Sequence, residues 1–162
     1  MGATGVYDSD TALDFMMEVV NIASEKAESN QQILVVADMM SKYSYPSPLD
    51  SALFVQVIKD ELDNLDCWKE YCREERKQVL LDLLNKSTKP YINENDNTII
   101  YPLGITEEGD FIIQLFSKDN DMKEMELDID YVMSNYSPNI FEDFEITLDG
   151  ISNEEVQKFF NM

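Results

Sequence analysis

Residues 98–116 of the chain read TIIYPLGITEEGDFIIQLF. Two runs rich in β-branched and aromatic residues, 98–103 and 111–116, flank a polar segment that contains Gly109. Apolar runs on either side of a short glycine-containing turn are typical of an antiparallel β-hairpin. The stretch therefore predicts two paired strands joined by a turn at 106–110.

Downstream of this hairpin, residues 125–130 alternate apolar and acidic side chains. A period of two predicts a third strand with one acidic face. The same stretch can instead lead into a short helix at 131–135. A terminal helix is expected at 153–160, with Ser152 as its N-cap and Val156, Phe159 and Phe160 facing inward.

Upstream of the hairpin, apolar residues recur every three or four positions, which is typical of amphipathic helices. Ser47 followed by Pro48 and Asp50 is a helix-start signal, and Asp66 is a candidate cap for the helix after it. The pattern predicts four helices: one from Asp8–Asp10 to about Ala27, one from about Ile33 to Tyr43, one from Pro48, and one ending near Asn85.

Helices first and strands later predict an α+β fold. We expect an N-terminal bundle of about four helices, then a small antiparallel sheet (hairpin 98–116 plus the third strand) and a C-terminal helix. A chain of 162 residues is long enough to fold as one compact domain, 1–162, without metal or disulfide. Within it, 1–90 is a helical subregion and 91–162 a strongly acidic, β-containing one. Whether 91–162 folds independently stays open at this point.

The charge of the chain is strongly one-sided, with 33 acidic and 12 basic side chains, no histidine and a net charge of −21. Residues 91–162 hold 17 of the acids and 3 of the bases. The lack of histidine excludes Ser-His-Asp and Cys-His catalysis. Binding to nucleic acid is disfavoured as well, because phosphate contacts need Lys and Arg. We therefore expect neither an enzyme nor a direct nucleic-acid binder.

No apolar run approaches the roughly 18 residues of a membrane span, and Asp8, Asp10 and Asp14 lie where a signal peptide would be apolar. These features predict a cytoplasmic protein with no membrane partner. Cys67 and Cys72 are expected to be reduced structural thiols, because zinc needs about four ligands and the chain offers no others of this kind.

Residues 119–124 begin like a calcium-binding loop but do not continue as one. Lys123 and Glu124 stand at the fifth and sixth positions, where a ligand and a glycine are needed. A polar turn is the better interpretation, and no metal or other cofactor is expected.

A dense anionic surface attracts basic partners and accelerates their encounter. In 91–162, aromatic residues that include Tyr101, Phe141 and Phe144 are interleaved with the acids, as at many interfaces. The competing interpretation places the aromatics in the core and gives the acids a solubility role. The predicted partner-binding residues are Glu107, Glu108, Asp110, Asp119, Asp121, Glu124, Glu126, Asp128, Asp130, Tyr131, Tyr136, Glu142, Asp143 and Glu145.

The opening GATGVYDSDTALDF, residues 2–15, resembles that of a small bacterial domain family of unknown function. Its members begin Gly-Ala-Trp-Gly-Thr-Gly, then have an aromatic residue, an Asn/Asp-Asp pair and Ala-x-Asp-Trp or Ala-x-Asp-Phe. The Trp-Gly dipeptide is missing here. The resemblance implies a bacterial or phage origin and a cytosolic α-rich domain with no established activity. The matching residues are Gly5, Tyr7, Asp10, Ala12, Asp14 and Phe15.

Three functional hypotheses follow. The first is a non-enzymatic immunity protein or antitoxin, a toxin inhibitor that occludes the active site of a basic toxin; some small acidic domains of this kind resemble immunity proteins by analogy. The second is a phage-encoded nucleic-acid mimic that inhibits a host defence nuclease, in anti-restriction or anti-CRISPR fashion. The third is an enzyme that uses carboxylates and a divalent cation. The identity of the partner, the stoichiometry and the binding face stay open.

Overall fold

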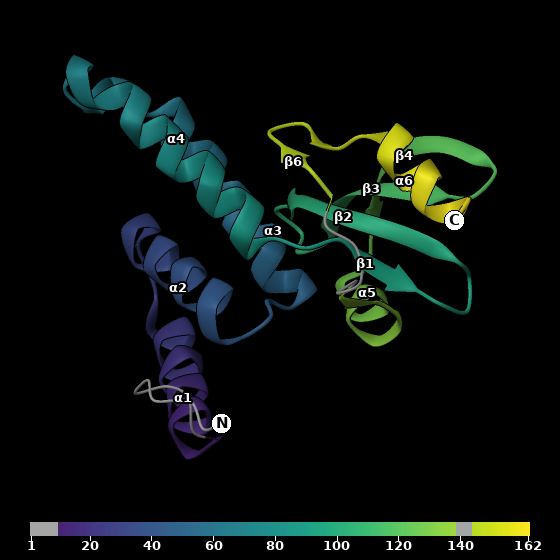
Figure 1. Ribbon diagram of the computed structural model, residues 1–162, viewed down its shortest axis with the longest axis horizontal. Coiled ribbons are helices and arrows are strands. Elements are labelled where there is room, and N and C mark those ends of the chain that lie inside the picture. Colours follow the sequence, from purple (N-terminus) through teal and green to yellow (C-terminus); the bar gives the residue numbers. More distant parts are fainter. Residues whose placement is uncertain (1–9, 139–143) are drawn as a thin grey trace, which may run out of the picture.

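The computed structural model describes residues 10–138 and 144–162 and shows a helical layer beside a sheet (Figure 1). The predicted α+β class is confirmed. A 3-10 turn, η1 (Leu65–Cys67), joins the last two helices of the layer. The helices of the layer are α1 (Asp10–Lys26), α2 (Asn30–Tyr43), α3 (Pro48–Asp63) and α4 (Glu70–Ser87).

Local capping decides where two of these helices begin. The Ser47 hydroxyl accepts a hydrogen bond from the Asp50 N–H at 3.2 Å, and the Asp50 carboxylate accepts one from the Ser47 N–H at 3.1 Å. Ser29 and Gln32 form the same reciprocal capping box at the start of α2. The sequence predicted Asp66 as the cap of α4, and this prediction is wrong. Asp66 lies within η1, and the N-cap position of α4 is Lys69.

The main sheet has five antiparallel strands in the order β4-β3-β2-β1-β5, and a separate two-stranded hairpin follows. The predicted strand pair and its turn are confirmed. Pro102 is tolerated inside β2 because the register shifts there, at a β-bulge. The strands are β1 (Tyr91–Asn93), β2 (Thr98–Ile105), β3 (Phe111–Ser117), β4 (Asn120–Leu127), β5 (Ser137–Pro138), β6 (Ile146–Thr147) and β7 (Gly150–Ile151).

The third predicted strand exists, but its bounds differ from those expected. β4 begins at Asn120 and ends at Leu127, and the chain then turns into α5 (Ile129–Asn135). Ile129 therefore starts a helix instead of continuing the strand, in agreement with the alternative of a short helix in this region. The terminal helix α6 (Asn153–Phe160) has the predicted bounds and follows Ser152 at the N-cap position.

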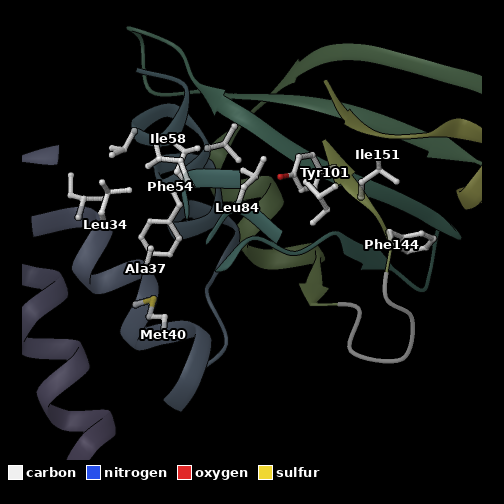
Figure 2. Close-up of a cluster of buried hydrophobic side chains, with 14 of the residues drawn as sticks. Leu34, Ala37, Met40, Phe54, Ile58, Leu84, Tyr101, Phe144 and Ile151 are labelled. Carbon is white, nitrogen blue, oxygen red and sulfur yellow. The ribbon is translucent and has the colours of Figure 1, made fainter. Parts of the chain in front are cut away.

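Both faces of the sheet are covered by helices. On one face, Val132 of α5 and Ala52 of α3 are buried with Tyr91 and Ile100. The other face contributes to a larger core that extends into the helical layer and to α6 (Figure 2). The side chains labelled in Figure 2 trace that core: Leu34, Ala37, Met40, Phe54, Ile58, Leu84, Tyr101, Phe144 and Ile151.

Buried tyrosine hydroxyls connect the helical segment to the sheet. The Tyr91 hydroxyl donates to the Pro46 carbonyl at 2.7 Å and shares a hydrogen bond of 2.7 Å with the Ser51 hydroxyl. The Tyr101 hydroxyl shares one of 2.9 Å with Thr88. The two subregions thus share buried polar contacts in addition to apolar packing.

Stability is expected to fall above pH 10 because of Tyr91 and Tyr101. Burial raises the pKa of both phenols above the ordinary value of about 10. Above pH 10 the unfolded phenols lose their protons while the folded ones keep them, so ionisation favours unfolding. The stabilising contribution is complete below pH 10 and is lost as the pH rises, by up to about 1.4 kcal/mol per pH unit for each tyrosine.

Urea denaturation between pH 8 and pH 11 measures this slope. Tyr91→Phe and Tyr101→Phe are each expected to be less stable at neutral pH but to lose less stability on further alkalinisation. An equal slope in the wild type and both variants would contradict the assignment.

Cys67 and Cys72 are both free. Among the described residues, no helix is long and apolar enough to cross a membrane.

Candidate partner-binding surface

The turn between β2 and β3 carries three of the predicted acids: Glu107, Glu108 and Asp110. Gly109 has a φ of 92°, a left-handed conformation that favours glycine. The Thr106 N–H donates to the Asp110 carbonyl at 2.8 Å, and the Asp110 N–H donates to the Thr106 hydroxyl at 3.0 Å. The turn is therefore closed by these contacts, and Glu107 and Glu108 are exposed at its tip.

The register of β3 and β4 brings further acids to the same end of the sheet. Phe111 pairs with Leu127, so Asp110, which precedes Phe111, lies near Asp128, which follows Leu127. Glu126 belongs to the adjacent pair. We call this group the acidic end; it consists of Glu107, Glu108, Asp110, Glu126, Asp128 and Asp130.

Two members of the acidic end also stabilise α5. The Asp128 carboxylate accepts a hydrogen bond from the Tyr131 N–H at 3.0 Å and so caps the helix. Asp130 lies in the first turn, where a negative charge interacts favourably with the helix dipole. These acids therefore have a structural role whether or not they contact a partner.

The structure does not bring all the predicted acids to this end. Glu124 is exposed in the middle of β4, whereas Asp119 and Asp121 lie at the opposite end of the sheet, roughly 20 Å away by the rise of the strand. There the β1–β2 turn adds Glu94 and Asp96, which the sequence analysis did not include. The polar run 93–97 between two apolar runs was the signal for that turn.

Glu145 lies in a third location, beside β6. Its N–H donates to the Glu155 carboxylate at 3.2 Å, and both residues line a hollow of about 240 Å³ together with Asp149. Glu155 and Asp149 were not predicted. Phe141, Glu142 and Asp143 lie outside the described residues.

Most of the predicted aromatic anchors that the structure describes are buried. Tyr136 is only 8% exposed, because α5 turns it toward the sheet, where its hydroxyl shares a hydrogen bond of 2.9 Å with Thr98. Burial also raises the pKa of Tyr136. Tyr101 and Phe144 are core residues. Tyr131 is 41% exposed, and its hydroxyl donates to the Asp96 carboxylate at 3.4 Å; its ring is the part of the predicted anchors that stays accessible to a partner among the described residues.

The charge of the acidic end is not neutralised by ion pairing. Between the described residues there are two ion pairs, Lys42–Asp38 at 3.0 Å and Arg76–Glu61 at 3.6 Å, and both lie in the helical layer. No group of three or more Asp, Glu or Cys side chains in the described part of the chain is arranged to hold a metal ion.

One exposed aromatic feature was missed. Trp68 and Tyr71, at the start of α4, are 39% and 79% exposed. The Arg76 guanidinium lies 4.7 Å from the centre of the Trp68 ring, and the Lys69 ammonium 6.0 Å from that of Tyr71. The signal in the sequence was two aromatic residues beside the helix break at 63–66.

Comparison with known proteins finds no family model, curated protein or solved structure that matches the chain. The resemblance of residues 2–15 to a bacterial domain family stays a prediction.

Proposed function

We propose that the chain is a non-enzymatic acidic binding protein that inhibits a basic partner protein, in the manner of an immunity protein that covers the active site of a toxin. The observation that carries this proposal is the acidic end, where six carboxylates of one turn, one strand end and one helix start gather without an ion pair among the described residues. Such a concentration of charge steers a cationic surface into contact.

Exposed apolar side chains lie on the same two elements as these acids. Met125 of β4 is 37% exposed, and Tyr131 and Met133 of α5 are 41% and 45% exposed. Aromatic and methionine side chains commonly supply the desolvated centre of an interface. In this proposal the carboxylates accelerate and orient the encounter, and the apolar groups hold the complex together.

Neutralising the turn at the acidic end is expected to slow association with the partner by about tenfold or more at low salt. The variant is Glu107→Gln/Glu108→Gln/Asp110→Asn, and its matched control is Glu18→Gln/Glu25→Gln/Glu28→Gln, whose three acids are exposed in and just after α1. Both remove three negative charges, so a difference between them reports position instead of net charge.

The partner is first captured from the native host on immobilised wild-type chain, eluted with salt and purified. Its association rate is then measured by stopped flow across a range of salt concentrations. The association rates of the wild type and the control are expected to fall as the salt concentration rises. The association rate of the turn variant is expected to depend much less on salt. Equal rates for both variants, or a rate independent of salt, would contradict the proposal. A defence nuclease as the purified partner would instead favour the nucleic-acid-mimic hypothesis.

A further inference from the structure

A hollow of about 580 Å³ lies where the end of α2, the loop after it and the end of α4 meet, with α1 at its side. Among the described residues, its lining includes Lys42, Lys86 and Lys89 and no acidic residue. Three of the twelve basic side chains of a chain with a net charge of −21 thus surround one cavity. We call it the lysine hollow; the residues used below are Ser44, Tyr45 and the three lysines.

These lysines are not used to satisfy the carbonyl groups at the helix ends. At the end of α4, the Ser87 hydroxyl donates to the Leu83 carbonyl at 2.6 Å, and the Thr88 hydroxyl donates to that of Leu84 at 2.5 Å. At the end of α2, the Ser44 N–H donates to the Met40 carbonyl at 3.0 Å. The carbonyls of Leu83, Leu84 and Met40 are therefore bonded by neighbouring residues of the same helix ends and not by these lysines.

Two of the three ammonium groups have no partner among the residues that the structure describes. Lys42 pairs with Asp38 at 3.0 Å, which raises the pKa of that ammonium. Lys86 and Lys89 make no ion pair or hydrogen bond through their side chains within residues 10–138 and 144–162. Lys86 and Lys89 thus carry positive charge without an ion pair from the described residues, while Asp38, which pairs with Lys42, lines a neighbouring hollow with Asp82 and Lys86.

The walls of the hollow are fixed by buried neighbours. The loop is anchored where the Pro46 carbonyl accepts the Tyr91 hydroxyl, and Lys89 stands between the buried residues Thr88 and Pro90. Tyr45 is 65% exposed on this anchored loop and presents an aromatic ring at the rim. Fixed backbone reduces the ordering that a ligand would otherwise have to impose.

We propose that the lysine hollow binds a phosphate-bearing small molecule of nucleotide size, with its phosphates among Lys42, Lys86 and Lys89 and its base against Tyr45. Lysine is a common phosphate ligand, and the volume falls within the usual range for small-molecule sites. A nucleic-acid polymer is disfavoured, because it would extend from the hollow across a surface whose negative charge repels it within a Debye length of about 8 Å, whereas a small ligand fits inside the hollow. This site is independent of the acidic end.

Isothermal titration calorimetry with sodium pyrophosphate and with ATP, in metal-free buffer of low salt, tests the proposal. The variant Lys86→Gln/Lys89→Gln is expected to weaken both ligands at least tenfold. The control Lys26→Gln/Lys158→Gln removes two exposed lysines that, like Lys86, lie in the last turn of a helix, here α1 and α6. Both variants have the same net charge, so a difference between them reports the position of the lysines; because Lys26 and Lys158 do not line the hollow, the control should bind both probes about as well as the wild type.

The variant Tyr45→Ala distinguishes a nucleotide ligand from a phosphate ligand without a base. It is expected to weaken ATP about fivefold or more while leaving pyrophosphate unchanged, because base stacking on an aromatic ring is lost only for the nucleotide. Equal affinity of Tyr45→Ala and wild type for ATP would overturn the nucleotide assignment. If neither pyrophosphate nor ATP bound at about 10 mM, the site would be overturned altogether. The same holds if the two lysine double variants lost equal affinity. Circular dichroism confirms that each variant is folded.

Discussion

Gly150→Ala is expected to lower the free energy of unfolding by about 3–5 kcal/mol, because it combines backbone strain with the loss of buried hydrogen bonds. Gly150 has a φ of 97°, and a Cβ built on it would lie 2.1 Å from the Gln114 Oε1 atom. Gln114 is 4% exposed. The substitution therefore has to displace the Gln114 side chain, the β6–β7 hairpin, or both.

That displacement breaks the contacts that hold the hairpin on the sheet. The Gln114 amide donates to the Asp149 carbonyl at 2.9 Å and accepts from the Ile151 N–H at 2.9 Å. A buried amide that loses both partners costs roughly 1–3 kcal/mol for each unsatisfied group. The strain of a left-handed non-glycine residue adds about 1–2 kcal/mol.

Gly109→Ala is the matched control, because it has the strain without the collision. Its φ is 92°, and no atom lies within 4 Å of the position of an added Cβ. We expect a loss of about 1–2 kcal/mol. Urea denaturation followed by circular dichroism measures both variants. If the two lost the same stability, the Gln114 contacts would have no special weight.

A second large effect is expected when residues 91–162 are expressed alone: this fragment should not fold. The sheet would lose Ala52 and the other helical residues that cover its faces. The Tyr91 hydroxyl would lose Ser51 and Pro46, and the Tyr101 hydroxyl would lose Thr88. Burial of roughly 60% of the surface is marginal for a chain of this size even when its own core is intact.

Amide proton dispersion in NMR spectra and a urea titration test this expectation. The fragment should give narrow dispersion and no cooperative transition, whereas the full chain should unfold in a single one. Adding residues 1–90 as a second fragment is the control, and it should restore dispersed signals. A cooperative transition of 91–162 alone would show that the sheet is a separate domain.

The sequence predicted well the elements whose signals are local. The third helix has its own capping box at Ser47, and the hairpin at 98–116 has a glycine turn between two apolar runs. The strands β5, β6 and β7 have two residues each, too few for a periodic pattern. The Asp149-Gly150 pair was a local turn signal for the β6–β7 hairpin, but the attachment of this hairpin to the sheet depends on Gln114, which is more than thirty residues earlier.

For the candidate surface, the sequence predicted which kinds of residue take part but not which of them lie together. Which acids converge depends on the β3–β4 register and on the position where β4 ends, and neither can be read from alternation alone. Tyr136 illustrates the same limit, because the orientation of a seven-residue helix decides whether its ring faces the sheet or the solvent. The lysine hollow combines residue 42 with residues 86 and 89, which only the packing of two helix ends brings together.

β4 forms an edge of the sheet, and charged side chains line it on both faces. An open edge of this kind invites a further strand, yet like charges make a second copy of the same strand an unfavourable neighbour. The chain can thus be concentrated without stacking edge to edge, while a lysine-rich strand from another polypeptide meets no such barrier.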